Sequence, residues 1–358
     1  MRTAAVNFLE LAAYKPRIEA ELRRQYADAR RSARPVFRPY LDLLAEFTLR
    51  GGKRFRALLV LAGYHLATGR EPSGALSAAA ALEHFQSWML IHDDIIDHSE
   101  ERRGGPTLHR SLARQHAEEQ GLGASAEYGV ALGITLGDLE EPFTVAALGA
   151  ARVSEGRRAA ALSEYARMTR ETAFGQLLDV RNGSRPVSAV TERDVLLVHE
   201  LKSAYYTVAS PLRIGASLGG ARGNLLRRLD EIGVDLGVAF QLRDDVLGAG
   251  LGTGDPGKSA NDLVEGKRTL LVVRAWARAG NEGRSLIERV LGRADAPATD
   301  VAALRELIRA TGSLDYSERR ITALRRRASR RIAAASGLTG AGRSLLEEIG
   351  DRLVDRSV

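Results

Sequence analysis

The sequence predicts an all-α fold, a helical bundle of about ten or more helices around a deep central cavity. Three observations lead to this prediction. Ala, Leu, Arg and Glu dominate the chain, and all four are frequent in helices. Apolar residues recur at spacings of three and four far more often than at two. The alternating pattern that is typical of strands is sparse.

Clusters of Gly, Pro and Ser divide the chain into segments of helical length. These breaks lie at 34–39, 68–74, 121–125, 181–190, 219–223, 248–257 and 337–342. Thr191 is followed three residues later by Asp194, a capping-box pattern that predicts a helix start. Because no break is both long and low in complexity, we expect one domain over residues 1–358.

The composition excludes several classes of protein. The 358 residues are 44% hydrophobic, which suffices for a packed core, and include no Cys. A disulfide scaffold, a thiolate zinc site and a Cys nucleophile are therefore excluded. The first residues lack a basic stretch followed by an apolar one, and no apolar run approaches the ~18 residues of a membrane span. We expect a soluble, cytoplasmic protein without a membrane span.

Basic residues outnumber acidic ones by 52 to 45, which gives a formal net charge of +7. In the densest basic segment, 318–331, the apolar residues Ile321, Leu324 and Ala328 recur at helical spacing. Ile332, directly after the segment, continues this pattern. This spacing favours a helix with its arginines on the solvated face. The segment has no neighbouring aromatic residues for base stacking, which argues against nucleic acid as the partner.

The segment GGKRFR, residues 51–56, opens an apolar helix. Backbone N–H groups and the helix dipole at such a helix start attract anions. Lys53 and Arg56 add two cationic side chains to the same turn. The segment is therefore a candidate phosphate-binding site, although each cation taken singly is also typical of ordinary surface charge.

An acidic motif follows the apolar helix that contains residues 82–92. Asp93 and Asp97 are four residues apart, so their carboxylates share one helix face, with Asp94 one residue round. Three carboxylates here repel one another, and this repulsion is tolerable if divalent cations lie between them; such oxygen ligands suit Mg2+. A solvated helix end is the alternative for this motif alone. Arg102 and Arg103 follow within a turn or two.

A second acidic pair, Asp244 and Asp245, ends another apolar helical segment, GVAFQLRDDVLG. Two carboxylate clusters on separate helices that face each other across a cavity would hold several Mg2+ ions and leave positions for a phosphate ligand. Further cations lie nearby in sequence: Lys202 precedes the pair, and Lys258 and Lys267 follow it.

Residues 252–259, GTGDPGKS, match the pattern of a nucleotide-binding phosphate loop. Such a loop requires a preceding β-strand. The preceding residues, FQLRDDVLGAGL, are instead predicted to be helical. This disfavours a nucleotide triphosphatase.

The ordered motifs resemble those of the trans-isoprenyl diphosphate synthases, or polyprenyl synthetases, which include farnesyl and geranylgeranyl diphosphate synthases. The segments that carry the resemblance are GGKRFR, HDDIIDHSEERRGGPTLH, KSAYYT, GVAFQLRDDVLG, GKSANDLVEGKRT and the closing LLEEIGDRLVDR. The resemblance implies an isoprenoid synthase fold, a homodimer, and condensation of isopentenyl diphosphate with an allylic diphosphate. The implied product is a short all-trans prenyl diphosphate of C15–C20.

The resemblance also implies roles for individual residues. Three Mg2+ ions would be bound chiefly by Asp93, Asp97 and Asp244, supported by Asp94 and Asp245. The allylic diphosphate would be bound by Arg102, Lys202, Lys258 and Lys267, and isopentenyl diphosphate by Lys53, Arg56, His84 and Arg103. Gln241, Ser203 and the Lys202 carbonyl would stabilise the allylic cation, and the floor of the product cavity would be formed by Trp88, Met89 and Phe85.

The sequence departs from the family pattern at two positions. Gly248 stands where many relatives carry a third Asp of the second motif, and Ser203 replaces the commoner Thr. A noncatalytic subunit of a prenyl synthase is therefore one alternative. A terpene cyclase is another, although it would need no site for isopentenyl diphosphate. A basic helical protein that binds nucleic acid or an anionic membrane is the third.

Overall fold

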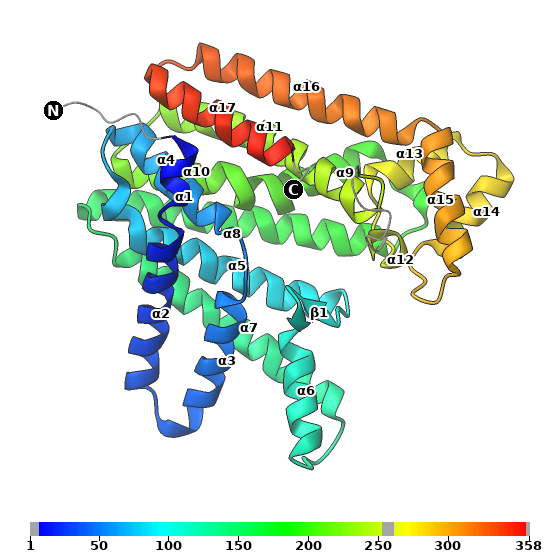
Figure 1. Ribbon diagram of the computed structural model, residues 1–358, viewed down its shortest axis with the longest axis horizontal. Helices are drawn as coiled ribbons and strands as arrows, with labels where there is room; N and C mark the ends of the chain where they lie inside the picture. The colour runs from blue at the N-terminus through cyan, green and yellow to red at the C-terminus, as the bar shows by residue number, and fades with distance from the viewer. Residues whose placement is uncertain (1–6, 253–260, 356–358) are drawn as a thin grey trace. The chain divides into compact units, whose positions relative to one another are not determined.

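The computed structural model describes residues 7–252 and 261–355. Within these ranges the chain is almost entirely helical (Figure 1). The strands described form a short antiparallel hairpin, β1 (Glu101–Arg102) with β2 (Gly105–Pro106), in which Glu101 pairs with Pro106. The prediction of an all-α fold is confirmed.

The chain divides into two compact units. The first comprises Met1–Ser163 with Pro211–Ala221, and the second comprises Glu164–Ser210 with Arg222–Val358. The expectation that residues 1–358 act as one catalytic domain stays a prediction. Each unit contains one of the two aspartate motifs.

The first unit contains the helices of the N-terminal half and one returning helix. These are α1 (Phe8–Ala12), α2 (Lys15–Ser32), η1 (Pro35–Phe37), α3 (Arg38–Leu49), α4 (Phe55–Thr68), η2 (Pro72–Ala75), α5 (Leu76–Ile96), α6 (Leu108–Glu118), α7 (Ser125–Gly149) and most of α10 (Ser210–Gly219).

Helix α5, which carries the first aspartate motif, is the centre of the first unit. It packs against α7 and α4, and its buried alanines Ala78–Ala81 allow these neighbours to approach. Apolar side chains from α2, α3, α5, α6 and α7 form one core cluster: Tyr26, Leu44, Phe47, Ile91, Leu108, Leu112 and Leu136. The core packing therefore extends along α5 as far as Ile91, two residues before the first aspartate motif.

The second unit contains the remaining helices. These are α8 (Glu155–Gly183, whose first turns belong to the first unit), η3 (Val187–Ala189), α9 (Glu192–Val198), η4 (His199–Ala209), α11 (Asn224–Gly248), α12 (Asn261–Val264), α13 (Leu270–Arg278), α14 (Asn281–Val290), α15 (Ala298–Ala310), α16 (Ser313–Ala334) and α17 (Gly340–Val354). Helix α11, which carries the second aspartate motif, packs against η4, α16 and α17.

Most predicted helix boundaries agree with the structure. Helices end at Ser32, Thr68, Gly183, Gly219 and Gly248, within or beside the predicted breaks. The capping box is confirmed, because the Thr191 side chain accepts from Asp194 N–H and the Asp194 carboxylate accepts from Thr191 N–H. The start of α4 within residues 51–56 was predicted, but two features were not: the left-handed conformation of the turn before α4, and the π-helical conformation of η4.

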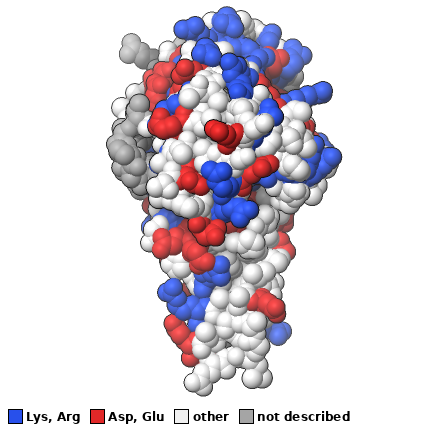
Figure 2. All heavy atoms as spheres, turned by 90° about the vertical axis from the view of Figure 1, so that its right-hand side faces the viewer, with Lys and Arg blue, Asp and Glu red and all other residues white. Residues whose placement is uncertain are grey.

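The basic segment at 318–331 lies in α16, where Ile321, Leu324, Ala328 and Ile332 are buried as predicted. Its arginines are not simply solvated. Arg327 and Arg331 both form ion pairs with the buried carboxylate of Asp235 on α11, the latter at 2.7 Å. On the face shown in Figure 2, basic and acidic side chains are interspersed. The arginine charge of α16 thus partly serves to hold α16 on α11.

No helix within residues 7–252 and 261–355 combines the length and the apolar character that crossing a bilayer requires.

Candidate active site

A tight turn precedes α4 in the first unit. Gly51, Gly52 and Arg54 all have positive φ angles, of 60°, 94° and 55°. A non-Gly residue adopts this left-handed conformation at a cost unless other contacts hold it. The Arg54 side chain is only 1% exposed, and its Nη1 donates to the Thr48 carbonyl at 2.9 Å and to Glu83 Oε2 at 3.1 Å. These buried contacts fix the turn that contains Lys53.

Arg103 lies against the same turn. Its Nη1 donates to the Arg50 carbonyl at 3.2 Å, and a Cβ on Gly52 would lie 3.4 Å from its Cζ. Burial lowers the pKa of Arg103; the Glu83 carboxylate opposes this shift, while neighbouring arginines, including Arg56, lower the pKa further. Arg56 and Arg103 are therefore part of one concentration of positive charge. Lys53 is exposed at this turn.

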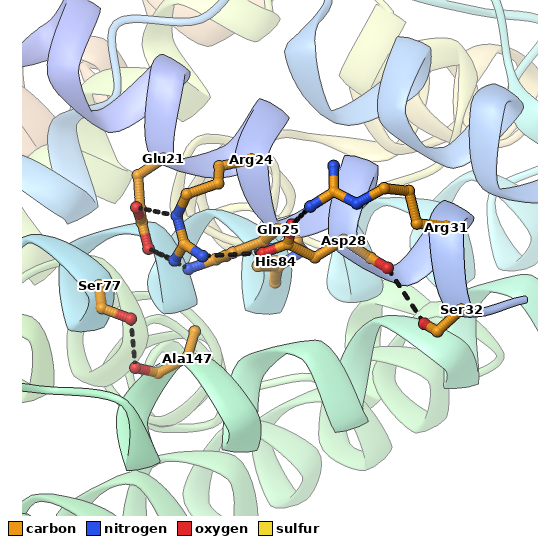
Figure 3. A network of polar contacts seen from close by, with 9 residues as sticks. All are labelled: Glu21, Arg24, Gln25, Asp28, Arg31, Ser32, Ser77, His84 and Ala147. Atoms are coloured by element: carbon orange, nitrogen blue, oxygen red, sulfur yellow. Dashed lines mark hydrogen bonds and ion pairs between the residues drawn. The ribbon is translucent and has the colours of Figure 1, made fainter.

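His84 lies in a buried polar network rather than on a surface. Its Nδ1 is 2.7 Å from Glu140 Oε2, and its Nε2 is 2.9 Å from Gln25 Oε1. Figure 3 shows Gln25 between His84 and the charged side chains of α2. Tyr26 and Thr48 donate to the other oxygen of Glu140, at 2.6 and 3.1 Å. Protein partners thus occupy both ring nitrogens of His84, and its predicted contact with a diphosphate stays a prediction.

The first aspartate motif lies at the C-terminal end of α5. Asp97 caps this helix by donating its N–H to the Asp93 carbonyl at 2.8 Å, and both side chains are half-buried. Asp94 is only 1% exposed and accepts two hydrogen bonds from Arg102, of which the one from Nε is 2.9 Å long. The hairpin β1–β2 positions Arg102 for this contact. Burial raises the pKa of Asp94, and Arg102 opposes that shift.

The second aspartate motif, near the end of α11, likewise combines a buried and a half-buried carboxylate. Asp245 is buried, accepts from Gln241 Nε2 at 3.0 Å, and lies 3.1 Å from His199 Nε2. Asp244 is half-buried. The buried carboxylate is therefore Asp94 in the first motif and Asp245 in the second. The residues predicted to be the principal metal ligands are the more exposed ones.

The π-helix η4 carries Lys202 and Ser203. π-Helical segments are rare in proteins, and those that do occur often lie at functional sites. Here η4 lies very close to its neighbours, because a Cβ on Gly175 of α8 would lie 2.2 Å from Lys202 N, and one on Gly237 of α11 would lie 2.5 Å from Ala204 Cα. The Lys202 Nζ donates to Asp179 Oδ2 at 2.6 Å. Sequence reasoning found Lys202 but not the close packing that positions it.

Lys267 follows α12 and contacts Asp262, which lies close enough to Asp245 for their charges to interact. Lys267 Nζ contacts Asp262 Oδ1 at 2.8 Å and Glu265 Oε2 at 2.9 Å. Burial alone would lower the pKa of Lys267, but these two carboxylates raise it above its usual value. Burial also raises the pKa of Asp262; Lys267 opposes the shift and Asp245 adds to it. Lys258 lies outside the described residues.

The predicted chain-length residues lie on α5, before the first aspartate motif. Phe85 is fully buried and makes an edge-to-face contact with Trp88, with ring centroids 5.4 Å apart. Trp88 and Met89 are half-buried. The contact with Phe85 holds the Trp88 ring, whose contact with a product stays a prediction.

A divalent metal fits the chemistry of these motifs. In the part of the chain that the structure describes, no group of three or more His, Cys, Asp or Glu side chains is arranged to hold a metal ion. The donors are nevertheless carboxylates, the hard oxygen ligands that suit Mg2+. Oδ2 of Asp94 is buried and has no hydrogen-bond partner among the described residues. This donor set suits a hard divalent cation and no metal that needs a thiolate.

Comparison with known proteins gives consistent results. The polyprenyl synthetase family model matches residues 38–308. A geranylfarnesyl diphosphate synthase of Aeropyrum pernix is 31% identical over 86% of this chain and 91% of its own length. A (2E,6E)-farnesyl diphosphate synthase of Mycobacterium bovis is 31% identical over 85% of this chain and 80% of its own length.

A solved structure of geranylgeranyl pyrophosphate synthase from Corynebacterium glutamicum, complexed with isoprenyl diphosphate and magnesium, superposes with a TM-score of 0.88. It is 34% identical, and the alignment covers 97% of this chain and 99% of that one.

The helices and the two aspartate motifs thus define an all-α protein with the isoprenoid synthase fold. The chain belongs to the polyprenyl synthetase family, the trans-isoprenyl diphosphate synthases, which use a divalent metal and isoprenyl diphosphate substrates.

Proposed function

We propose that this chain is a short-chain trans-prenyltransferase that condenses isopentenyl diphosphate with an allylic diphosphate and releases inorganic diphosphate. The observation that carries the proposal is the contact of Arg103 with the Gly51–Gly52 turn, beside Arg56. This positive charge suits a diphosphate group that binds separately from the aspartate motifs. A terpene cyclase would not need such a second site.

Asp93, Asp97 and Asp244 are the metal ligands in this proposal, and the metal is Mg2+, with three ions for each active site. The buried neighbours Asp94 and Asp245 orient the motifs, because each is tied to protein donors. When bound, Mg2+ neutralises charge on the departing diphosphate of the allylic substrate. Other divalent ions with the same ligand preference are expected to replace it only in part.

Side chains of this chain bind the allylic substrate and stabilise the charges that form during the reaction. Arg102, Lys202, Lys258 and Lys267 bind the allylic diphosphate and stabilise its negative charge as the C–O bond breaks. The isopentenyl double bond then attacks the allylic cation, and the proton that is lost passes to the released diphosphate. The dipoles of Gln241, Ser203 and the Lys202 carbonyl stabilise the cation. The apolar walls of the predicted central cavity exclude water that would quench it.

Lys53, Arg56 and Arg103 bind the diphosphate of isopentenyl diphosphate. The hydrogen bonds of His84 with Glu140 and Gln25 hold α5 against α7 and α2. The chain forms a homodimer, its location is cytoplasmic, and its product is C15–C20 with Trp88 near the floor of the product cavity. A noncatalytic subunit remains the second candidate, because Gly248 removes a carboxylate from the second motif.

The direct test is incubation of the purified chain with isopentenyl diphosphate, Mg2+ and dimethylallyl, geranyl or farnesyl diphosphate in turn, followed by chromatography of the products. We expect an elongated all-trans prenyl diphosphate and no product after metal chelation. Cyclic hydrocarbons from the allylic substrate alone would indicate a cyclase. Absence of any product with all three primers would favour the noncatalytic subunit.

A further inference from the structure

The arginines of α16 differ in whether the protein itself pairs them. Arg325 Nη2 contacts Asp351 of α17 at 2.6 Å. Arg327 and Arg331 share the buried carboxylate of Asp235 on α11. These ion pairs neutralise the arginine charge on the sides of α16 that face α11 and α17.

The remaining exposed arginines of α16 form a stripe along the helix. Arg319, Arg326 and Arg330 are exposed, and none of them makes a hydrogen bond or an ion pair with any residue in 7–252 or 261–355. At 3.6 residues per turn, separations of seven and eleven residues are close to two and three full turns. The three side chains therefore leave the helix within about 40° of one another and span about 16 Å of its length. These three residues form the arginine stripe.

The residues around the arginine stripe neither cover nor neutralise it. The other exposed residues of this face are small: Thr322, Ala323 and Ala333. No acidic residue follows Glu318 in α16, and the Glu318 carboxylate is bound by Arg243. Asp315, one turn before Arg319, is the acidic residue at the start of this face. The guanidinium groups extend furthest from the helix, so a flat anionic surface can contact all three at once.

We propose that the arginine stripe adsorbs the protein to bilayers that contain anionic lipids, by binding the phosphates of their headgroups. A guanidinium group binds phosphate through parallel N–H donors, and a bilayer presents many phosphates in one plane. This face has no large apolar side chain to insert, so the attraction is electrostatic and sensitive to salt. The inference goes beyond the proposed function and rests on it for the choice of lipid, because a C15–C20 prenyl product partitions into bilayers.

Nucleic acid is the other polyanion that arginines bind, and the aromatic residue of α16 argues against it. Single strands bind proteins largely by stacking bases on aromatic rings. Tyr316 is the one aromatic residue in α16. The Arg274 guanidinium lies 3.3 Å from its ring centroid, and its hydroxyl donates to Glu192 at 2.7 Å. These contacts hold the Tyr316 ring against α13 and α9, so it is not available to a base.

The test is cosedimentation of the full chain with vesicles of two parts phosphatidylcholine and one part phosphatidylglycerol at about 0.1 M salt. We expect binding that is lost at about 0.5 M salt and that is absent with phosphatidylcholine alone. One arginine near an anionic bilayer changes the partition coefficient about fivefold, so the triple variant Arg319→Gln, Arg326→Gln and Arg330→Gln should bind about 100-fold more weakly. Each single variant should bind about fivefold more weakly.

A matched control removes the same charge from other parts of the surface. It carries three Arg→Gln substitutions at exposed positions on separate segments: Arg70, Arg114 and Arg193. Both triple variants should melt like the parent, because all the substituted side chains are exposed. An equal loss of vesicle binding in the two variants would show that only net charge matters, and would overturn the inference. Tighter binding of the parent to a DNA duplex than to these vesicles, at equal phosphate concentration, would also overturn it.

The vesicle experiment contains no substrate, so its outcome is independent of turnover. If the chain forms no prenyl product but the stripe variant loses vesicle binding, the proposed function is wrong and the role of the arginine stripe is supported. If the chain forms prenyl products but the parent does not bind anionic vesicles, the role of the arginine stripe alone is overturned.

Discussion

Arg54 is the buried residue on which the cationic turn before α4 depends. It has a positive φ, and its guanidinium donates to Glu83 and to the carbonyls of Thr48 and Leu49. Arg54→Met leaves the buried carboxylate of Glu83 without this partner, so we expect a loss of about 3–5 kcal/mol in the free energy of unfolding. Chemical denaturation of the two proteins measures the loss.

Arg24→Gln is the matched control for this prediction. Arg24 forms ion pairs with Glu21 and Asp28, but its side chain is 56% exposed (Figure 3). An exposed pair contributes at most about 1 kcal/mol. If Arg54→Met costs no more than Arg24→Gln, the Arg54–Glu83 contact does not hold the turn.

The half-buried aspartates should be needed for turnover and not for folding. Asp93→Ala and Asp244→Ala each remove one proposed metal ligand, so we expect the rate of product formation to fall by orders of magnitude. The melting temperature without metal should change little, because neither side chain is in the buried core. Turnover close to that of the parent in either variant would refute the metal assignment at that residue. Measured rates with and without Mg2+ provide the comparison.

Helix η4 depends on close packing against α8 and α11. A Cβ on Gly237 would lie 2.5 Å from the Cα of Ala204, so Gly237→Ala must displace η4 or lose stability. We expect a lower melting temperature and weaker binding of the allylic substrate, because Lys202 moves with η4. Gly156→Ala in α8 is the control, since its Cβ would meet no atom within 4 Å. It should be neutral or slightly stabilising.

Helix α5 is expected to determine product length through Trp88. Trp88→Ala removes the largest side chain one to two turns before Asp93, so a longer product is expected if the indole meets the growing chain. Chromatography of products from the same primer measures the change. A product spectrum identical to that of the parent would mean that Trp88 serves only to pack against Phe85.

The features that the sequence predicts are those encoded by residues near one another in the chain. The capping box at Thr191 needs only Asp194, and the buried stripe of α16 needs only its own period. The aspartate motifs were found in the same way. The π-helix η4, the Arg54–Glu83 contact and the position of Asp262 over Gly248 each depend on residues brought together by folding. No pattern of residues near one another in the sequence predicts these three features.

At the scale of the whole molecule, we predict that the chain assembles with a second copy of itself. Apolar side chains of α8 remain exposed in the single chain, with Phe174, Leu177 and Val180 exposed to 49%, 68% and 50%. Exposed apolar clusters of this kind mark interfaces. We expect a homodimer at micromolar concentration in sedimentation experiments. Leu177→Glu should shift it toward the monomer without lowering the helix content, because the side chain has few internal neighbours to lose. A parent chain that sediments as a monomer would contradict the dimer, and a dimer unaffected by Leu177→Glu would exclude this part of α8 from the interface.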